Sequence, residues 1–144
     1  GIDHKKMIDK LYEASQAGVK VDLIVRGICC VVPGKPFSEN ITITRIVDRF
    51  LEHARVFVFS NQEDPEIYMA SADWMNRNLN RRIELCFPIY DKLIKKEVMG
   101  LLQLQLHDNI KARHLDYAHN NLPIDSAGKL RIRSQIETYK LLKG

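Results

Sequence analysis

The stretch HKKMIDKLYEASQAGVKVDLIV, residues 4–25, decides the fold class because two different periodicities meet within it. Its first part is helical, since apolar side chains recur on one face at Met7, Ile8, Leu11 and Tyr12. Gly18 then supplies the left-handed conformation that commonly ends a helix. The run VKVDLIV that follows is β-rich and nearly continuously apolar, which is typical of a buried parallel strand. A helix that leads directly into a buried strand predicts an α/β fold.

The rest of the chain continues this mixture of helix and strand patterns. Segment 40–54, NITITRIVDRFLEHA, predicts an amphipathic helix, because apolar residues follow helical spacing at Ile43, Ile46, Val47, Phe50 and Leu51. Strands are expected at 55–59, 67–72 and 81–89, with a polar turn at 60–66. Helices are expected at 91–108 and 135–143. Ser134 and Glu137 have the spacing of a capping box at the start of the last helix. We therefore predict one α/β domain over residues 1–144, a mixed sheet flanked by helices, with 107–133 less regular.

Composition narrows the class of protein. The 144 residues are 45% hydrophobic and 28% charged, as in ordinary globular domains, and no apolar run approaches the ~20 residues of a membrane helix. The net charge is 22 − 18 = +4, which favours an anionic partner. Three cysteines, at 29, 30 and 86, match neither a disulfide framework nor a zinc site. A cytoplasmic location is expected, and the leading glycine suggests a piece of a longer chain.

Arg26 is a candidate anion-binding residue. It follows the run DLIV directly, so it lies at the carboxyl end of a strand, where ligands bind in open α/β sheets. Gly27 comes next and would let the backbone approach a ligand closely. A surface arginine at the end of a strand is an equally good interpretation from the pattern alone.

RRIELCF, residues 81–87, is a second candidate. In a strand, Arg82 and Glu84 would share one face while Ile83, Leu85 and Phe87 would point into the core. The two charges predict either a surface ion pair or an arginine that a carboxylate holds ready for phosphate.

His53 and Arg55 lie where the predicted helix gives way to a strand. A histidine at a helix end interacts favourably with the helix dipole and needs no further role. Downstream, the strand at 67–72 ends in small residues around Ser71, and Asp73 follows. Small residues at this point would let a ligand approach the backbone closely.

The pattern H-x-R on a strand, followed by a strand that ends in a small-Ser-x-Asp turn, resembles the phospholipase D superfamily motif. The match departs from that motif at Arg55, Ala70 and Asp73, and Ser60 occupies the place of its acidic residue. The resemblance implies a phospholipase D-like half, in which phosphate chemistry runs through a histidine.

Longer blocks resemble a more specific family, namely LYEASQAGVKVDLIVRGICCVVPG, IVDRFLEHARVFVF and ASADWMNRNLNRRIELCFPI. They are similar to the C-terminal catalytic domain of the long-form polyphosphate kinases. That resemblance implies an enzyme that moves the terminal phosphate of ATP reversibly onto polyphosphate with Mg²⁺. It places Mg²⁺ and the phosphorylated histidine in a preceding catalytic domain, and no metal site in this chain.

The resemblance also implies roles for particular residues. His53 would be the second active-site histidine, acting as a general acid or base or stabilising the transferring phosphoryl group. The residues implied to bind ATP or phosphate are Arg26, His53, Arg55, Ser71, Asp73, Arg82 and Glu84. The expected partners are ATP, polyphosphate and the preceding domain, and no specific nucleic acid is expected. At full length the protein is expected to form homo-oligomers and to contact a membrane peripherally.

Two other functions stay open at this point. The first is a phospholipase D-type phosphodiesterase that pairs two His53 residues in a homodimer. The second is a non-catalytic module that binds polyanions. Trp74 and Tyr68 are the aromatic residues expected near the site, which is few for stacking on nucleic-acid bases.

Overall fold

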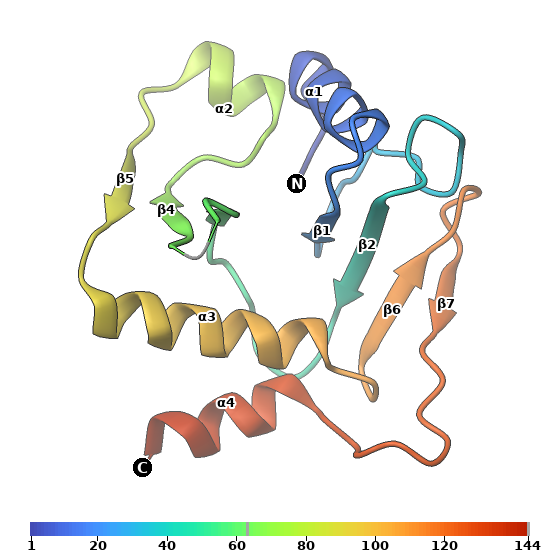
Figure 1. Ribbon diagram of the computed structural model, residues 1–144, viewed down its shortest axis with the longest axis vertical. Coiled ribbons are helices and arrows are strands. Elements are labelled where there is room, and N and C mark those ends of the chain that lie inside the picture. Colours follow the sequence, from blue (N-terminus) through green and yellow to red (C-terminus); the bar gives the residue numbers. More distant parts are fainter. Residues whose placement is uncertain (63, 144) are drawn as a thin grey trace.

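The computed structural model describes residues 1–62 and 64–143. In chain order its elements are α1 (Lys5–Gln16), β1 (Val21–Ile24), β2 (Ile41–Ile46), β3 (Val56–Phe59), β4 (Glu66–Ala70), α2 (Asn76–Arg81), β5 (Cys86–Ile89), α3 (Lys92–Leu106), β6 (Ala112–Leu115), β7 (Asn121–Pro123) and α4 (Ser134–Lys143). In Figure 1, α1 and α2 lie at one end of the molecule and α3 and α4 at the other, with the strands between them. The predicted α/β class is confirmed, and the strands divide between two sheets.

The larger sheet has the strand order β1-β2-β6-β7. β1 and β2 are parallel, so their carboxyl ends meet at the same edge, whereas β6 runs antiparallel to β2 and β7 antiparallel to β6. This sheet is therefore mixed, as the sequence predicted. Its parallel pair creates the edge at which Arg26 lies.

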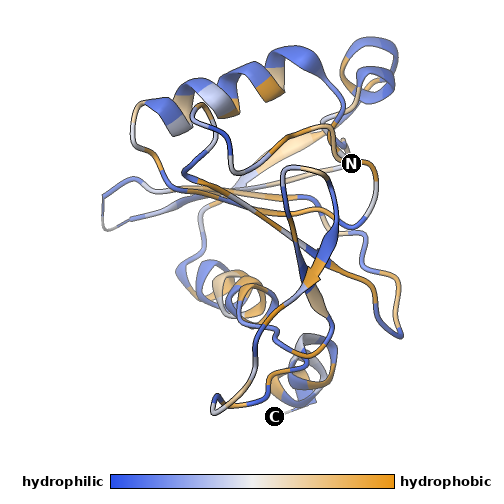
Figure 2. Ribbon diagram, turned by 90° about the vertical axis from the view of Figure 1, so that its right-hand side faces the viewer, coloured by the Kyte–Doolittle hydropathy of each residue, from blue (hydrophilic) through white to orange (hydrophobic). Residues whose placement is uncertain are grey.

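The main core lies between this sheet and α1. Ile8 of α1 is buried together with Ile41, Ile43 and Leu115 of the sheet, and Leu11 packs against the same cluster. Gly18 ends the helical segment with φ of 86°, the left-handed conformation expected from its position. In Figure 2 α1 is the long helix at the top, largely hydrophilic on the side away from the strands.

The smaller sheet is antiparallel, with the strand order β3-β4-β5. Ile67 and Ile89 are its most buried side chains, at 1% and 8% exposure. Phe57 and Trp74 stack face to face, with ring centroids 5.0 Å apart. The strands predicted at 55–59 and 67–72 therefore exist with shifted ends, and the turn predicted at 60–66 includes Glu63, which lies outside the described residues.

The helix predicted at 40–54 is wrong. Residues 41–46 form β2, and 47–55 have neither helix nor strand. All residues of the stretch ITITRI except Arg45 are β-branched, and such residues prefer a strand because their side chains lose rotamers in a helix. Ile43 and Ile46 are buried as expected, but Val47, Phe50 and Leu51 are 59–75% exposed. His53 consequently does not lie at the end of a helix.

The strand predicted at 81–89 is shorter than expected. Only residues 86–89 form β5, and Arg82 and Glu84 precede it. The side chains expected in the core point outward instead, with Ile83 104% and Leu85 64% exposed. A hydrogen bond from the Leu85 amide to the Ser71 hydroxyl, at 3.0 Å, fixes the backbone here in a way that no strand periodicity describes.

The C-terminal third contains more structure than the sequence indicated. Region 107–133 includes the β6–β7 pair, which completes the larger sheet. Helices α3 and α4 occur where they were predicted, and no described helix is long and apolar enough to cross a membrane. The predicted capping box is wrong, because the Ser134 hydroxyl donates to Asp108 and Glu137 accepts from Lys140.

Candidate active site

Arg26 lies in a bend immediately after β1. The amide of Val25 donates to the carbonyl of Thr44 at 2.9 Å, which extends the parallel pairing to the residue before Arg26. Arg45 of β2 then reaches across the sheet edge, and its guanidinium donates to the carbonyls of Gly27 at 2.9 Å and Val25 at 3.4 Å. Arg26 itself is exposed and pairs with no carboxylate in the described parts of the chain. Its charge is therefore available to a ligand.

The N-terminal segment brings the Arg26 loop close to a second loop that carries predicted site residues. Ile2 forms parallel bridges both to Cys29 on one side and to Trp74 on the other. The Ile2 amide donates to the carbonyl of Ile28 at 2.8 Å, and the Asp3 amide donates to that of Trp74 at 3.0 Å. The loop after β1 and the loop after β4 thus flank the same short segment.

Arg55, directly before β3, forms an ion pair with Asp73 of the second loop. Nε of Arg55 lies 3.3 Å from Oδ1 of Asp73, and Nη2 lies 3.4 Å from Oδ2. Burial opposes ionisation of Asp73, but hydrogen bonds from Arg55 and from the amino nitrogen of Gly1 outweigh it and hold its pKa below the usual range. Arg55 also donates from Nη1 to the carbonyl of His53 at 3.3 Å. This arginine therefore ties the backbone of His53 to the loop after β4.

Ser71 and Glu84 form a second pair beside the first. The hydroxyl of Ser71 donates to one carboxylate oxygen of Glu84, and the side-chain amide of Asn78 donates to the other at 2.7 Å. These two hydrogen bonds hold the pKa of Glu84 below its usual value, with smaller contributions from the charges of Arg82 and Arg55. Glu84 is therefore a fixed carboxylate beside two arginines.

Asn78 was missed by the sequence reasoning. It is 3% exposed, and its Oδ1 has no hydrogen-bond partner among the described residues. Its position within the WMNRN stretch gave no signal, because an asparagine in a short helix is usually exposed. Arg45 was also missed, because it lies in the segment that was predicted to be a helix and that forms β2 instead.

Hydrogen bonds join some of the predicted site residues to one another and leave others unconnected. Arg55 and Asp73 are joined to the backbone of His53, and Ser71 is joined to Glu84. The imidazole of His53 is exposed and, like Arg26, forms no hydrogen bond or ion pair with these groups within residues 1–62 and 64–143. Both are oriented by neighbouring backbone and not by side-chain contacts of their own.

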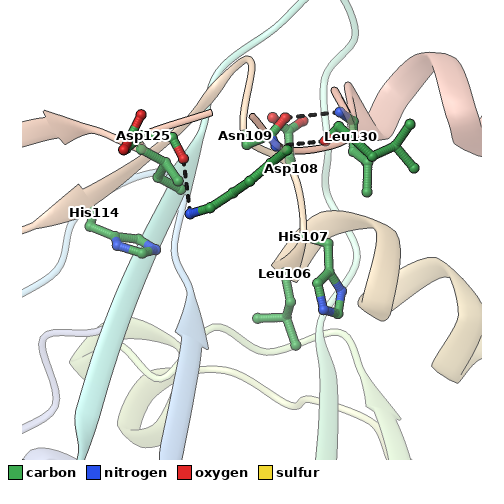
Figure 3. A pocket seen from close by; sticks show the side chains of 10 residues that line it. Leu106, His107, Asp108, Asn109, His114, Asp125 and Leu130 are labelled. Atoms are coloured by element: carbon green, nitrogen blue, oxygen red, sulfur yellow. Dashed lines mark hydrogen bonds between the residues drawn. The ribbon is translucent and has the colours of Figure 1, made fainter. Parts of the chain in front are cut away.

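A pocket of about 350 Å³ lies elsewhere, between the end of α3 and the β6–β7 hairpin (Figure 3). His107, His114 and Asp125 are on its wall, and Lys129 donates to the carbonyl of Asp125 at 3.2 Å. None of the predicted site residues lines this pocket. Across the described ranges, no group of three or more His, Cys, Asp or Glu side chains is placed so that it could hold a metal ion.

Comparison with known proteins identifies the family. The family model described as "Polyphosphate kinase C-terminal domain 2" matches residues 1–135. The chain is 47% identical over 140 residues to a polyphosphate kinase of Vibrio vulnificus, strain YJ016, and 46% identical over 138 residues to one of Bacillus anthracis. These matches cover 96% and 95% of this chain but 20% of each relative.

A solved structure gives the same result in three dimensions. The crystal structure of a polyphosphate kinase from Porphyromonas gingivalis superposes on this chain with a TM-score of 0.97 and 46% sequence identity. The superposition covers 100% of this chain and 22% of the other. The chain thus spans about a fifth of the length of these relatives, and it belongs to the polyphosphate kinase C-terminal domain 2 family.

Proposed function

We propose that this chain supplies one side of the active site of a polyphosphate kinase, an enzyme that transfers the terminal phosphoryl group of ATP reversibly to inorganic polyphosphate. One observation carries the assignment of the phosphate site. Arg26 lies exposed at the carboxyl end of a parallel strand, and no carboxylate of the described residues neutralises it. Open α/β sheets bind their ligands at this edge, and a guanidinium can donate two parallel hydrogen bonds to a phosphate group.

Phosphoryl transfer asks little of the protein beyond positioned charge. The transferring group spreads negative charge over its equatorial oxygens, and fixed donors that face these oxygens stabilise the transition state. In this proposal Arg26 and Arg82 bind the phosphates directly, because neither is engaged by an ion pair in the described residues. The carboxylate of Glu84, which Ser71 and Asn78 hold in place, adds a fixed negative charge near Arg82 without pairing with it.

His53 is the proposed proton-transfer residue. When the bond between the terminal phosphorus and its bridging oxygen breaks, that oxygen gains charge, and an imidazolium can donate a proton to it. In the reverse direction the neutral imidazole accepts the proton. Arg55 supports this role by holding the His53 carbonyl, while Asp73 and Ser71 keep Arg55 and Glu84 in place.

The other half of the site is proposed to come from a companion catalytic domain, which would carry the phosphorylated histidine and Mg²⁺. We therefore expect the 144-residue chain to bind polyphosphate without making ATP from polyphosphate and ADP. Measurable ATP synthesis by the purified chain would contradict the proposal that a second domain supplies half of the active site.

Calorimetry with inorganic polyphosphate at about 50 mM and 200 mM salt tests the phosphate site. Binding should weaken with salt, and Arg26→Ala should lower the affinity about tenfold, as expected for the loss of a hydrogen bond to a charged group. Arg131→Ala is the matched control, because it removes the same charge from an exposed position between β7 and α4. Equal losses in the two variants would mean that the chain attracts polyphosphate only through its net charge.

A further inference from the structure

The segment that carries His53 has no regular secondary structure. Residues 47–55 connect β2 to β3 without forming a helix or a strand of their own. Such a segment would ordinarily be mobile, since no ladder of backbone hydrogen bonds fixes it. Here side chains from the start of α4 supply the missing hydrogen bonds.

Gln135 binds the backbone of this segment from both directions. Its Oε1 accepts from the amide of Phe50 at 2.8 Å, and its Nε2 donates to the carbonyl of the same residue at 2.8 Å. Nε2 also lies 3.2 Å from Oε1 of Glu52. The side-chain amide of a glutamine has the donor and acceptor of a peptide group, so Gln135 replaces a neighbouring strand at this point. Gln135 is only 4% exposed, which protects these hydrogen bonds from water.

Arg133 holds the same segment two residues earlier. Its Nε and Nη2 donate to the two carboxylate oxygens of Asp48 at 2.8 Å and 2.6 Å. The Asp48 side chain is 2% exposed, and the hydrogen bond from Arg133 lowers its pKa. A two-pronged contact of this kind fixes direction as well as distance. We call Arg133 and Gln135 the α4 clamp.

The clamp is itself anchored to the body of the domain. Asp108 is 1% exposed and accepts from the amide and the hydroxyl of Ser134, at 2.7 Å and 2.8 Å. Ser134 lies between the two clamp residues in the chain. Asp108 also accepts from three consecutive amides that lead into β6, the last of them that of Ala112, its first residue. The clamp is thus tied to the larger sheet.

On the other side of His53, Arg55 bonds both to the carbonyl of His53 and to Asp73. The backbone of His53 is therefore held at residues 48–52 by the α4 clamp and at residue 55 by the loop after β4. Within residues 1–62 and 64–143, the exposed imidazole of His53 forms no hydrogen bond or ion pair.

We propose that Arg133 and Gln135 are positioning residues for His53, which hold the imidazole at a fixed place beside the bound phosphates. This inference rests on the proposed function, because it assumes that His53 faces the phosphate site. Proton transfer needs the donor within hydrogen-bond reach of the reacting oxygen, and displacements of about 1 Å can cost about a hundredfold in rate. A clamp 80 or more residues away in sequence then decides the geometry of the reaction.

The test uses the 144-residue chain and inorganic tripolyphosphate as the probe. NMR measures the hydrogen-exchange rate of the Phe50 amide and the change in the His53 imidazole signals at saturating tripolyphosphate. Gln135→Ala should speed exchange at Phe50 about tenfold, as expected for one lost hydrogen bond. It should also reduce the imidazole response several-fold, while the dissociation constant changes by less than about twofold. Gln103→Ala, which alters an exposed glutamine of α3, is the matched control.

Arg133→Lys is the second variant, in case Gln135→Ala does not fold. It keeps the positive charge opposite Asp48 but cannot form both hydrogen bonds, so it should reduce the imidazole response in the same way. An unchanged imidazole response, or unchanged exchange at Phe50 in Gln135→Ala, would overturn the proposal. If tripolyphosphate binds through Arg26 but never shifts His53 in the wild type, the proposed role of His53 fails and the clamp loses its function with it. If Arg26→Ala leaves the affinity unchanged, the phosphate site itself is wrongly placed.

Discussion

Replacing Asp108 by asparagine should destabilise the domain more than most single substitutions. The carboxylate is buried, and one of its oxygens accepts from the amides of Ile110, Lys111 and Ala112 at 2.7–3.0 Å. The other oxygen accepts from the amide and the hydroxyl of Ser134. An asparagine can still offer one oxygen to the three amides. Its NH₂ group, however, would face the two Ser134 donors, and neither of those hydrogen bonds can form.

The size of the effect follows from these two lost hydrogen bonds. A hydrogen bond to a charged group contributes about 1.5–3 kcal/mol, so the substitution should cost roughly 3–6 kcal/mol. Domains of this size are stable by about 5–15 kcal/mol in total, which makes the loss a large fraction of the whole. At about 2–4 °C per kcal/mol, the midpoint of thermal unfolding should fall by roughly 6–24 °C.

The effect should also depend on pH. Burial disfavours the charged form of Asp108, but the hydrogen bonds from Ser134 and from the amides of Lys111 and Ala112 outweigh it and lower the pKa in the folded state. A lowered folded pKa means that this stabilisation is present above the unfolded pKa of about 3.9 and is lost as the pH falls through the folded value. The difference between wild type and Asp108→Asn should therefore shrink below about pH 4.

Chemical denaturation at pH 7 and at acidic pH measures both quantities. Ser134→Ala, which removes only the hydroxyl donor, should cost about half as much at pH 7. Asp116→Asn is the matched control, since Asp116 accepts from backbone amides in an exposed turn, and it should change stability far less. A loss below about 1 kcal/mol in Asp108→Asn, or one that persists unchanged at low pH, would refute the reasoning.

Three further predictions concern other parts of the domain. Ile67→Ala should cost about 2–5 kcal/mol in urea unfolding, because Ile67 is 1% exposed at the centre of the smaller sheet; a cost under 1 kcal/mol would contradict that placement. Arg55→Met should raise the pKa of Asp73, since burial then acts with less opposition, and a carboxyl NMR titration would show it; an unchanged titration would count against the pair. Arg45→Met should weaken polyphosphate binding in calorimetry only while Arg26 is present, because Arg45 holds the carbonyls that flank it. Equal losses with and without Arg26 would make Arg45 an independent charge.

Local signals predicted the elements that depend on local physics. Helix α1, with its apolar face and its Gly18 terminus, and the strand β1 directly after it both occur where the sequence placed them. The helix prediction for segment 40–54 was wrong because the segment contains both a helical and a strand-like spacing of apolar residues. Ile43 and Ile46 fit a helix, yet the alternation of Ile and Thr from Ile41 to Thr44 fits a strand as well. Pairing of β2 between β1 and β6 decides the outcome, and no local window contains that information.

In the candidate site, too, contacts between residues far apart in the sequence could not be predicted from local patterns. Arg26, Arg55 and Asp73 could be placed near predicted strand ends from short patterns. The ion pair between Arg55 and Asp73 was not predicted. The contacts of Gln135 with Phe50 join residues 85 apart, and that of Asp108 with Ser134 joins residues 26 apart. Glutamine and serine at the start of a helix usually serve only the helix itself. Their long-range role could not be predicted from sequence spacing.

These long-range contacts change how substitutions in this domain should be interpreted. The backbone around His53 is held before any substrate arrives, by buried hydrogen bonds that reach α4 and the larger sheet. Preorganised groups of this kind need no reorganisation when charge develops in the transition state. Under the proposed function, a variant at Asp108 or Gln135 would therefore lower the activity of the full-length enzyme without touching a phosphate, and the loss would resemble a catalytic defect. Measurements of stability and of polyphosphate affinity on the same variant distinguish a lost positioning contact from a lost phosphate contact. A residue that only positions His53 leaves the polyphosphate affinity unchanged.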